Sequence, residues 1–147
     1  MRLWTLAALL FLAGCSTAPP PPAVHDAALP PWYTQSIAQL NEINRQAQSD
    51  FEHGKSDAAA AKIKDAQMVA ARLLSVPKPT LEAAEAAADV DDLYGRMLLA
   101  NRNYAWAQMF FQKNRSRWKN WTPQTPETER RFKQAEAEIA ECDKHID

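Results

Sequence analysis

Few residues of this chain have the types and the spacing that enzymes or metal sites use. The three histidines, His25, His53 and His145, lie far apart, and none has a second ligand at the short spacing of a zinc site. The chain contains no Gly-x-Ser-x-Gly, His-Glu-x-x-His, phosphate-loop or Cys-x-x-Cys motif. The sequence therefore predicts a protein that is not an enzyme and that holds neither a metal ion nor a cofactor.

Asp89, Asp91 and Asp92 form the densest group of carboxylates, the ligands that calcium prefers. A calcium site also requires a loop with a glycine at its turn, whereas these aspartates follow a helical pattern. Two of them continue a charged ridge at helical spacing, which consists of Glu82, Glu85, Asp89, Asp92 and Arg96. The pattern favours a solvated helix face, and a calcium site is the alternative.

One cysteine near the N-terminus has a more specific context. Arg2 precedes an apolar run from Leu3 to Ala13, which is far shorter than the ~20 apolar residues of a transmembrane helix. The run ends in Leu12-Ala13-Gly14-Cys15, and small residues before a cleavage site are what signal processing requires. This tetrapeptide resembles the lipobox of bacterial lipoproteins. An ordinary secretory signal followed by a chance cysteine is the alternative.

The lipoprotein resemblance implies that residues 1–14 are a signal peptide that is removed, and that Cys15 carries acyl chains. Each buried CH₂ contributes ~0.8 kcal/mol, so two or more chains anchor a protein stably in a membrane. Ser16 stands where an aspartate often signals inner-membrane retention in Gram-negative lipoproteins. The resemblance therefore implies a lipid anchor in the bacterial outer membrane, on its periplasmic face.

Residues 15–31 are expected to tether the lipid to a folded domain, residues 32–147. The tether holds four consecutive prolines, Pro19–Pro22, and ends in a second proline pair. Such segments favour extended polyproline II, which spans ~3.1 Å per residue and acts as a semi-rigid spacer. A ligand for a proline-reading domain is the alternative function of this tract.

Charge and composition narrow the class of protein further. Without residues 1–14 the chain has 133 residues, 16 Lys and Arg against 18 Asp and Glu, and a formal net charge of −2. This balance argues against nucleic acid as a partner, because nucleic-acid binding normally requires a strongly basic face. Alanine accounts for 27 residues of the full chain, and it is the best helix former.

The apolar periodicity indicates an all-α domain of about five antiparallel helices. Gly54 ends the first helix, Ser56 is expected to be the N-cap of the second, and Thr80 the N-cap of the third. Thr125 followed by Pro126 starts the last helix, which should cover the others. The expected inward residues are Ile37, Leu40, Ala47 and Phe51; Ala59, Ile63, Ala66, Ala70 and Leu73; Ala86, Val90, Leu93 and Met97; Tyr104, Ala107, Phe111 and Trp118; and Phe132, Ala135, Ile139, Cys142 and Ile146.

One helical hairpin has a recognisable pattern. Gly95, Tyr104, Ala107 and Phe111 resemble a tetratricopeptide repeat, which combines small residues where helices cross with aromatic residues beside them. A weaker copy consists of Ala47, Gly54, Ala59, Ile63 and Ala66. The two copies are offset by 48 residues, whereas the family repeat is 34. We expect Ala107 to face Gly95 closely, and generic helical hairpins are the alternative.

A basic and aromatic segment is the best candidate for a binding surface. Four cations and two indoles lie within nine residues, Lys113, Arg115, Arg117, Trp118, Lys119 and Trp121. Cations also stabilise the C-terminal end of any helix, which is the alternative explanation. Because Trp118 follows the inward pattern and Trp121 falls beyond it, we expect Trp121, Arg115 and Lys119 to form the edge of a partner-binding surface.

Cys142 is left without a partner if Cys15 is lipidated. A lone cysteine in an oxidising compartment is either a buried thiol or part of an intermolecular bond. Its place on the inward face of the last helix favours the buried thiol.

These features predict an outer-membrane-anchored lipoprotein whose helical domain is a non-enzymatic protein-binding module. Its partner would be another envelope protein, for example in a secretion or assembly machine, since repeat-like hairpins usually bind proteins. The alternative is a structural or peptidoglycan-associated lipoprotein that regulates cell-wall enzymes.

Overall fold

The computed structural model describes residues 29–146, and all regular secondary structure in that range is α-helical. The expected all-α class is therefore confirmed. The helices are α1 (Pro31–Glu52), α2 (Ser56–Leu74), α3 (Leu81–Ala100), α4 (Tyr104–Asn120) and α5 (Pro126–Asp143). The predicted signal peptide, Cys15, His25 and most of the tether lie outside the described residues.

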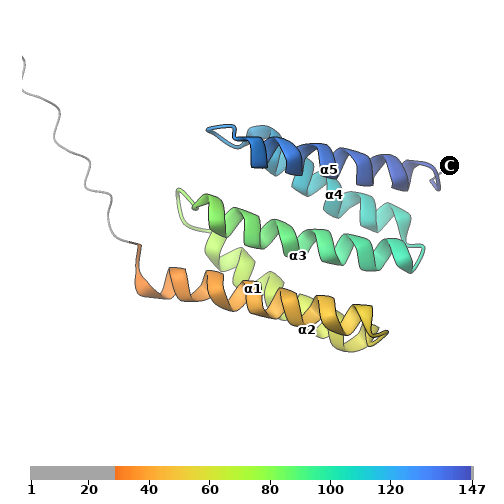
Figure 1. The fold of residues 1–147 in the computed structure, drawn as a ribbon, viewed down its shortest axis with the longest axis horizontal. Helices are drawn as coiled ribbons and strands as arrows, with labels where there is room; N and C mark the ends of the chain where they lie inside the picture. The colour runs from red at the N-terminus through yellow and green to blue at the C-terminus, as the bar shows by residue number, and fades with distance from the viewer. Residues whose placement is uncertain (1–28, 147) are drawn as a thin grey trace, which may run out of the picture.

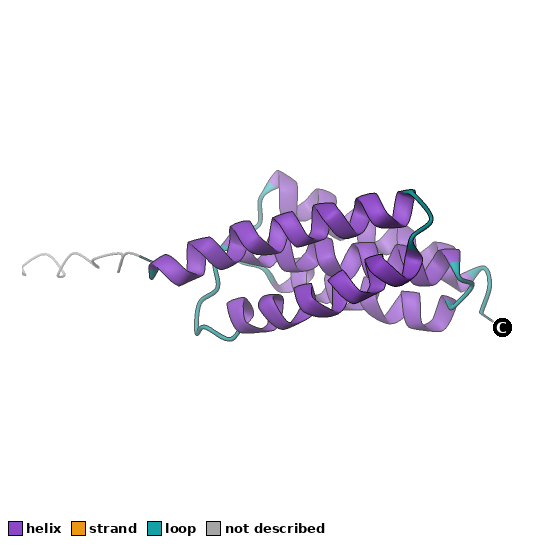
Figure 2. Ribbon diagram, turned by 90° about the horizontal axis from the view of Figure 1, so that it is seen from below, coloured by secondary structure: helices purple, strands orange, loops and turns teal. Residues whose placement is uncertain are grey.

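The helices are arranged in two layers. In Figure 1, α1, α3 and α5 lie in the nearer layer, and α2 and α4 lie behind them. Figure 2, seen from below, shows that the connections lie at the two ends of the long helices. Each helix packs on its neighbours in the chain, and α1 also packs on α3. α3 is therefore the central helix, with α1, α2 and α4 packed around it.

The largest apolar cluster, here called the N-terminal core, lies between α1, α2 and α3. The inward residues expected for α2 and for α3 are all buried, because their spacing of three and four places them on one helix face. Its buried members are Tyr33, Leu40, Ala47, Ala59, Ile63, Ala66, Ala70, Leu73, Ala83, Ala86, Ala87, Val90, Leu93 and Met97.

Two smaller clusters attach α4 and α5 to α3. One consists of Ala84, Ala88 and Trp118, with Phe132 and Trp121 packed against it. The other is built from Ala107, Phe111 and Cys142, with Leu98, Leu99 and Ile139 around them. α3 is thus buried on two faces, which explains why alanines occupy so many of its first positions: a small side chain lets helices approach from both sides.

The helix ends largely follow the expected capping. Thr80 Oγ1 accepts a hydrogen bond of 3.2 Å from the backbone N–H of Ala83, and Thr125 Oγ1 accepts one of 3.2 Å from Thr128. The Thr128 hydroxyl in turn accepts from the Thr125 N–H at 2.8 Å, which completes a capping box. Gly54 ends α1 with a φ of 73°, a conformation that glycine adopts without strain.

Several local expectations are wrong. Ser56 is already inside α2, and Lys55 stands at the N-cap without a side-chain hydrogen bond. Ile146 lies beyond the end of α5 and is 38% exposed, because the helix stops at Asp143.

The close contact expected between Gly95 and Ala107 is made by a different residue. A Cβ built on Gly95 would lie 2.5 Å from Cε1 of Phe111, so the phenyl ring and not the methyl of Ala107 occupies that space. Ala107 is nevertheless fully buried in the adjoining cluster.

Candidate functional site

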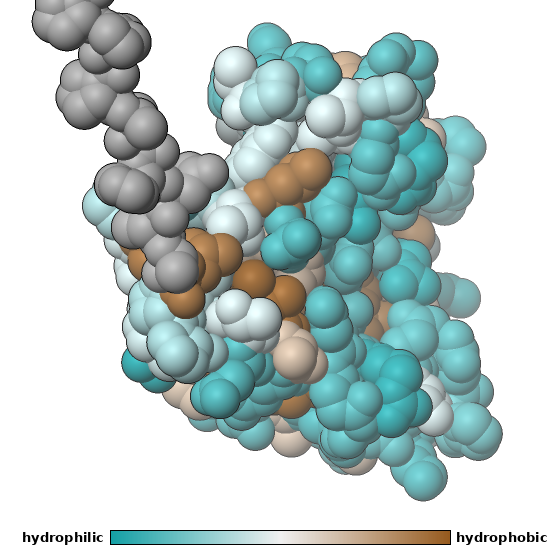
Figure 3. All heavy atoms as spheres, turned by 60° about the vertical axis from the view of Figure 1, so that its left-hand side comes forward, coloured by the Kyte–Doolittle hydropathy of each residue, from teal (hydrophilic) through white to brown (hydrophobic). Residues whose placement is uncertain are grey.

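A groove runs along the layer formed by α1, α3 and α5, and we call it the α1–α3–α5 groove. Its volume is ≈ 270 Å³. The surface in Figure 3, which brings the side of the molecule near Pro31 forward, shows hydrophobic side chains between hydrophilic ones. The groove is lined by Thr34, Ile37 and Asn41 of α1, by Glu82, Glu85, Ala86 and Asp89 of α3, and by Arg131 of α5.

Arg131 joins α5 to α3 at the wall of this groove. Its Nη1 lies 2.6 Å from Asp89 Oδ1, and its Nε lies 2.7 Å from Glu127 Oε1 and 4.0 Å from Glu85 Oε1. Burial acts to lower the pKa of Arg131, but the hydrogen bond and charge of Asp89 outweigh it, and the pKa is raised. Arg131 therefore lies among three carboxylates, of which Glu127 also pairs with Arg130 at 2.6 Å.

Glu127 is the carboxylate most strongly held in its charged form. Hydrogen bonds from Arg130 and then Arg131, opposed by partial burial, lower the pKa of Glu127 to about 2. A carboxylate with so low a pKa stays ionised at any physiological pH.

Polar side chains also join α1 to α3 further along the same layer. Arg96 Nη2 donates to Gln48 Oε1 at 3.0 Å, and its Nε donates to Asp92 Oδ2 at 2.9 Å. Within the described residues, Asn44 Oδ1 is buried without a hydrogen-bond partner. Gln48 of α1 thus contacts a charged side chain of α3 in addition to the apolar contacts between the two helices.

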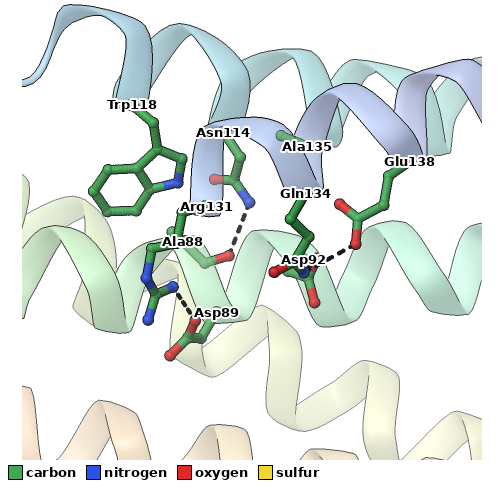
Figure 4. Close-up of a pocket in the computed structure, with 9 residues that line it drawn as sticks. All are labelled: Ala88, Asp89, Asp92, Asn114, Trp118, Arg131, Gln134, Ala135 and Glu138. Atoms are coloured by element: carbon green, nitrogen blue, oxygen red, sulfur yellow. Dashed lines mark hydrogen bonds and ion pairs between the residues drawn. The ribbon is translucent and has the colours of Figure 1, made fainter. Parts of the chain in front are cut away.

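A second, small cavity of ≈ 20 Å³ lies between α3, α4 and α5 (Figure 4). Gln134 bridges two carboxylates there, because its Nε2 donates to Asp92 Oδ1 at 3.2 Å and to Glu138 Oε1 at 3.1 Å. Burial raises the pKa of Glu138 to about 8, and the hydrogen bond and negative charge of Asp92 add to the effect. Glu138 therefore holds its proton to a higher pH than an ordinary glutamate does.

Asp91 corrects the expectation of a solvated face around the aspartate cluster. Its side chain is 4% exposed, and its carboxylate binds Arg117 Nη2 at 2.9 Å and Lys113 Nζ at 2.8 Å. On α4, the side-chain amide of Asn114 donates a hydrogen bond of 3.0 Å to the backbone carbonyl of Ala88 on α3. The cluster is split between two sides of α3, because Asp91 points to α4 while Asp89 and Asp92 point towards α5.

The basic and aromatic segment from Lys113 to Trp121 contains both buried and exposed side chains. Arg117, one of its four cations, turns inward to Asp91. Trp121 is partly buried, with its ring centroid 6.2 Å from that of Trp118, so the indole beyond the helix is not left exposed. Lys119 is exposed.

Arg115 lies on the side of α4 that faces α5. Its Nε is 3.2 Å from Glu136 Oε1, and its guanidinium carbon is 5.8 Å from the ring centroid of Phe132. The structure therefore connects Arg115 to α5, while Trp121 packs into the cluster around Trp118. Arg115 and Lys119 are exposed and lie four residues apart on α4, whereas Trp121 is partly buried just beyond its end.

An exposed aromatic surface was missed by the sequence analysis. Trp106 is 60% exposed and Met109 is 54% exposed, both on the outward face of α4. Beside them, the rings of Tyr104 and His145 stack with centroids 4.3 Å apart. The signal was present in the spacing, because positions 106 and 109 lie opposite the inward positions 107, 111 and 118.

Cys142 is a free thiol that is fully buried, as expected from its helix face. Burial raises the pKa of this thiol, and the nearby carboxylates of Asp143 and Glu138 raise it further.

Residues 29–146 lack two kinds of structural feature. No group of three His, Cys, Asp or Glu side chains in that range could hold a metal ion. None of the described helices is long and apolar enough to cross a bilayer.

The fold and the groove together define an all-helical domain with two layers and, along one of them, a groove lined by apolar side chains and by three carboxylates of α3. No protein-family model, curated protein or solved structure matches the chain.

Proposed function

We propose that this chain is a lipoprotein of the outer membrane, anchored through Cys15, and that its helical domain binds another envelope protein through the α1–α3–α5 groove. The domain acts as an accessory or assembly factor without catalytic activity. The tetratricopeptide-like character of its hairpins is part of this proposal.

The observation that carries the proposal is the layered arrangement of the helices. The first helix of each hairpin, α1 and α3, lies with α5 in one layer, and the second helices, α2 and α4, lie behind (Figure 1). Stacked hairpins of this kind expose one continuous surface for another protein. Here that surface carries the groove of ≈ 270 Å³, which side chains from three helices line.

The anchor is supported by the sequence alone. Cleavage before Cys15 would place the lipid at the end of a proline-rich tether that leads directly into Pro31, the first residue of α1. Mass spectrometry of the protein from membranes should show an acylated N-terminal cysteine. Cys15→Ser should abolish both the acylation and the cleavage, and an unmodified N-terminus at another residue would overturn the anchor.

Site-specific photocrosslinking in cells tests the groove as the binding surface. A photoreactive amino acid at Asn41 lies in the groove, whereas the same amino acid at Asp65 lies on the exposed face of α2 and serves as the matched control. The proposal expects a defined protein adduct from position 41 that is absent from position 65. Equal adducts from both positions, or none from position 41, would contradict it.

Sedimentation with purified cell wall distinguishes the proposed module from the alternative, a peptidoglycan-associated lipoprotein. A peptidoglycan-associated protein sediments with cell wall in the absence of other proteins, whereas the proposed module remains in solution.

A further inference from the structure

We infer that the α1–α3–α5 groove receives a basic segment of the partner protein, in which a Lys or Arg side chain lies against the carboxylates of α3. This inference rests on the proposed function, because it names the chemistry of the partner for the same groove. It is carried by the charge, the size and the lining of the groove.

Charge is the first argument. Glu82, Glu85 and Asp89 of α3 line the groove together with a single cation, Arg131, which leaves a formal net charge of −2 at this site. The whole chain has a formal net charge of only −1, so the groove is locally more acidic than the protein around it. A cationic partner is attracted to such a concave, acidic surface.

The ion pairs already present leave room for another cation. Arg131 is closest to Asp89, at 2.6 Å, and reaches Glu85 only at 4.0 Å. Glu82, one turn earlier on α3, is exposed and also lines the groove. A lysine or arginine between Glu82 and Glu85 would therefore find two carboxylates, and Arg131 approaches Glu85 only to 4.0 Å.

Size and lining are the second argument. The groove volume of ≈ 270 Å³ is below the about 300–1,000 Å³ of small-molecule pockets, and it suits a few side chains of a larger partner. Ile37 and Ala86 supply an apolar floor for the methylene stem of a long cationic side chain. Asn41 and Thr34 on α1 carry both donors and acceptors, which can bind a peptide backbone.

The N-terminal segment of the chain itself is a poorer match for this groove. Residues 15–28 contain no lysine or arginine, and their charged side chain is Asp26. An acidic groove does not attract such a segment. The basic stretch between Lys113 and Lys119 could enter the groove of a second copy, and that outcome is distinguished below.

Fluorescence anisotropy with a defined probe tests the inference. The probe is a short labelled peptide that alternates lysine with leucine, and its control replaces each lysine by glutamate. The proteins are the domain from residue 15 onward, its double variant Glu82→Gln/Glu85→Gln, and a matched double variant Asp57→Asn/Asp65→Asn on α2, outside the groove. Thermal unfolding monitors the folding of all three proteins.

The inference expects the groove variant to bind the lysine probe at least about tenfold more weakly, whereas the α2 variant stays within about twofold of the unmodified domain. The glutamate probe should bind none of them. Equal weakening by both variants, or equal binding of both probes, would overturn the inference. A concentration-dependent dimer in sedimentation that the groove variant abolishes would also overturn it, because a second copy would then be the occupant.

The failure of this inference is distinguishable from failure of the proposed function. Crosslinking from Asn41 without binding of the lysine probe would retain the groove as the docking surface and reject its basic occupant. Loss of crosslinking from Asn41 would reject the docking surface itself.

Discussion

The two halves of the domain are held to the central helix α3 by different kinds of interaction. On one side, α1 and α2 pack on α3 through the N-terminal core, whose buried members are all apolar. On the other side, α4 and α5 pack on α3 through two small apolar clusters and a network of charged side chains. That network includes Asp91 with Arg117 and Lys113, Asp89 with Arg131, and Asp92 with Gln134.

The difference predicts how each half responds to its surroundings. Burial of apolar area is non-directional and nearly independent of pH, so the α1–α2–α3 half should tolerate changes of solution conditions. Within that network the ion pair of Asp91 with Arg117 is buried, and such a pair depends on both partners being present and correctly charged. The α4–α5 hairpin should therefore be the part of the domain that a single charge change or a pH change loosens first.

The largest effect expected from this comparison is the loss of Asp91. Asp91→Ala leaves the guanidinium of Arg117, which is 11% exposed, without its carboxylate. Removal of one partner of a buried ion pair typically costs about 3–5 kcal/mol. The free energy of unfolding from urea titration should fall by that amount, which is a large fraction of the ~5–15 kcal/mol of a small domain.

Two control variants sharpen that measurement. Asp91→Leu combined with Arg117→Met removes both charges and should recover most of the loss, because apolar replacements of a buried pair are often neutral. Asp50→Ala, which removes the more exposed pair with Lys62 between α1 and α2, should cost less than about 1 kcal/mol. Equal losses for Asp91→Ala and Asp50→Ala would remove the distinction between the two halves.

The junction between α3 and α4 is the next test. Gly95→Ala places a methyl group 2.5 Å from the ring of Phe111, which is fully buried. Overpacking of this kind costs about 1–3 kcal/mol, although alanine is otherwise about 1 kcal/mol better than glycine inside a helix. We expect a net loss of about 1–2 kcal/mol in the free energy of unfolding.

A double-mutant cycle checks the cause of that loss. Phe111→Leu shortens the side chain, so Gly95→Ala should be less costly in that background, with a coupling of more than about 0.5 kcal/mol. If Gly95→Ala stabilises the domain, the close contact between α3 and α4 does not constrain the fold as described.

The sequence predicted the α1–α2–α3 half of the domain better than the contacts of the α4–α5 hairpin with α3. The spacing of Ala59, Ile63, Ala66, Ala70 and Leu73 was sufficient because α2 buries one face. Thr80 and Thr125 were recognisable as caps because capping depends on residues within one turn.

The contacts between α3 and the α4–α5 hairpin could not be predicted from a pattern that gives each helix a single buried face. Asp91 was assigned to a solvated surface because the pattern analysis gave α3 a single inward face, whereas α4 covers a second one. The five alanines around Glu85 were a signal for burial on more than one face, because Ala83, Ala84 and Ala86–Ala88 point in several directions around α3. The groove itself depends on how α1, α3 and α5 align, and no local pattern encodes that alignment.

The pH dependence of stability is expected to come from Glu138, among other groups. Its pKa is raised from 4.5 to about 8 in the folded state, by burial first and then by Asp92. The folded state therefore holds this proton more tightly than the unfolded state. The resulting stability is complete below pH 4.5 and is lost as the pH rises towards 8, by at most about 1.4 kcal/mol per pH unit.

Glu138→Gln should remove that loss, because a glutamine stays neutral and can still donate to Asp92. Unfolding free energies measured between pH 5 and pH 8 should show a flatter profile for Glu138→Gln than for the unmodified domain. Glu136→Gln, two residues earlier and on the exposed side of α5, is the matched control and should leave the slope unchanged. An unchanged slope for Glu138→Gln would mean that the carboxyl is already ionised at neutral pH.

The smallest effect is expected at the exposed face of α4. The side chains of Arg115 and Glu136 are each 44% exposed, and the ion pair between them is 3.2 Å long. Exposed pairs contribute about 0–1 kcal/mol, because water and salt screen them. Arg115→Ala combined with Lys119→Ala should therefore change the free energy of unfolding by less than about 1 kcal/mol, against the much larger loss for Asp91→Ala.

The same double variant should weaken partner association, most clearly at low salt, if these residues form the edge of a binding surface. Crosslinking yield from Asn41 in this background is the measurement, and Lys133→Ala on the outer face of α5 is its control. An undiminished yield would confine partner binding to the α1–α3–α5 groove, and a large loss of stability would show that surface charges also hold α4 and α5 together.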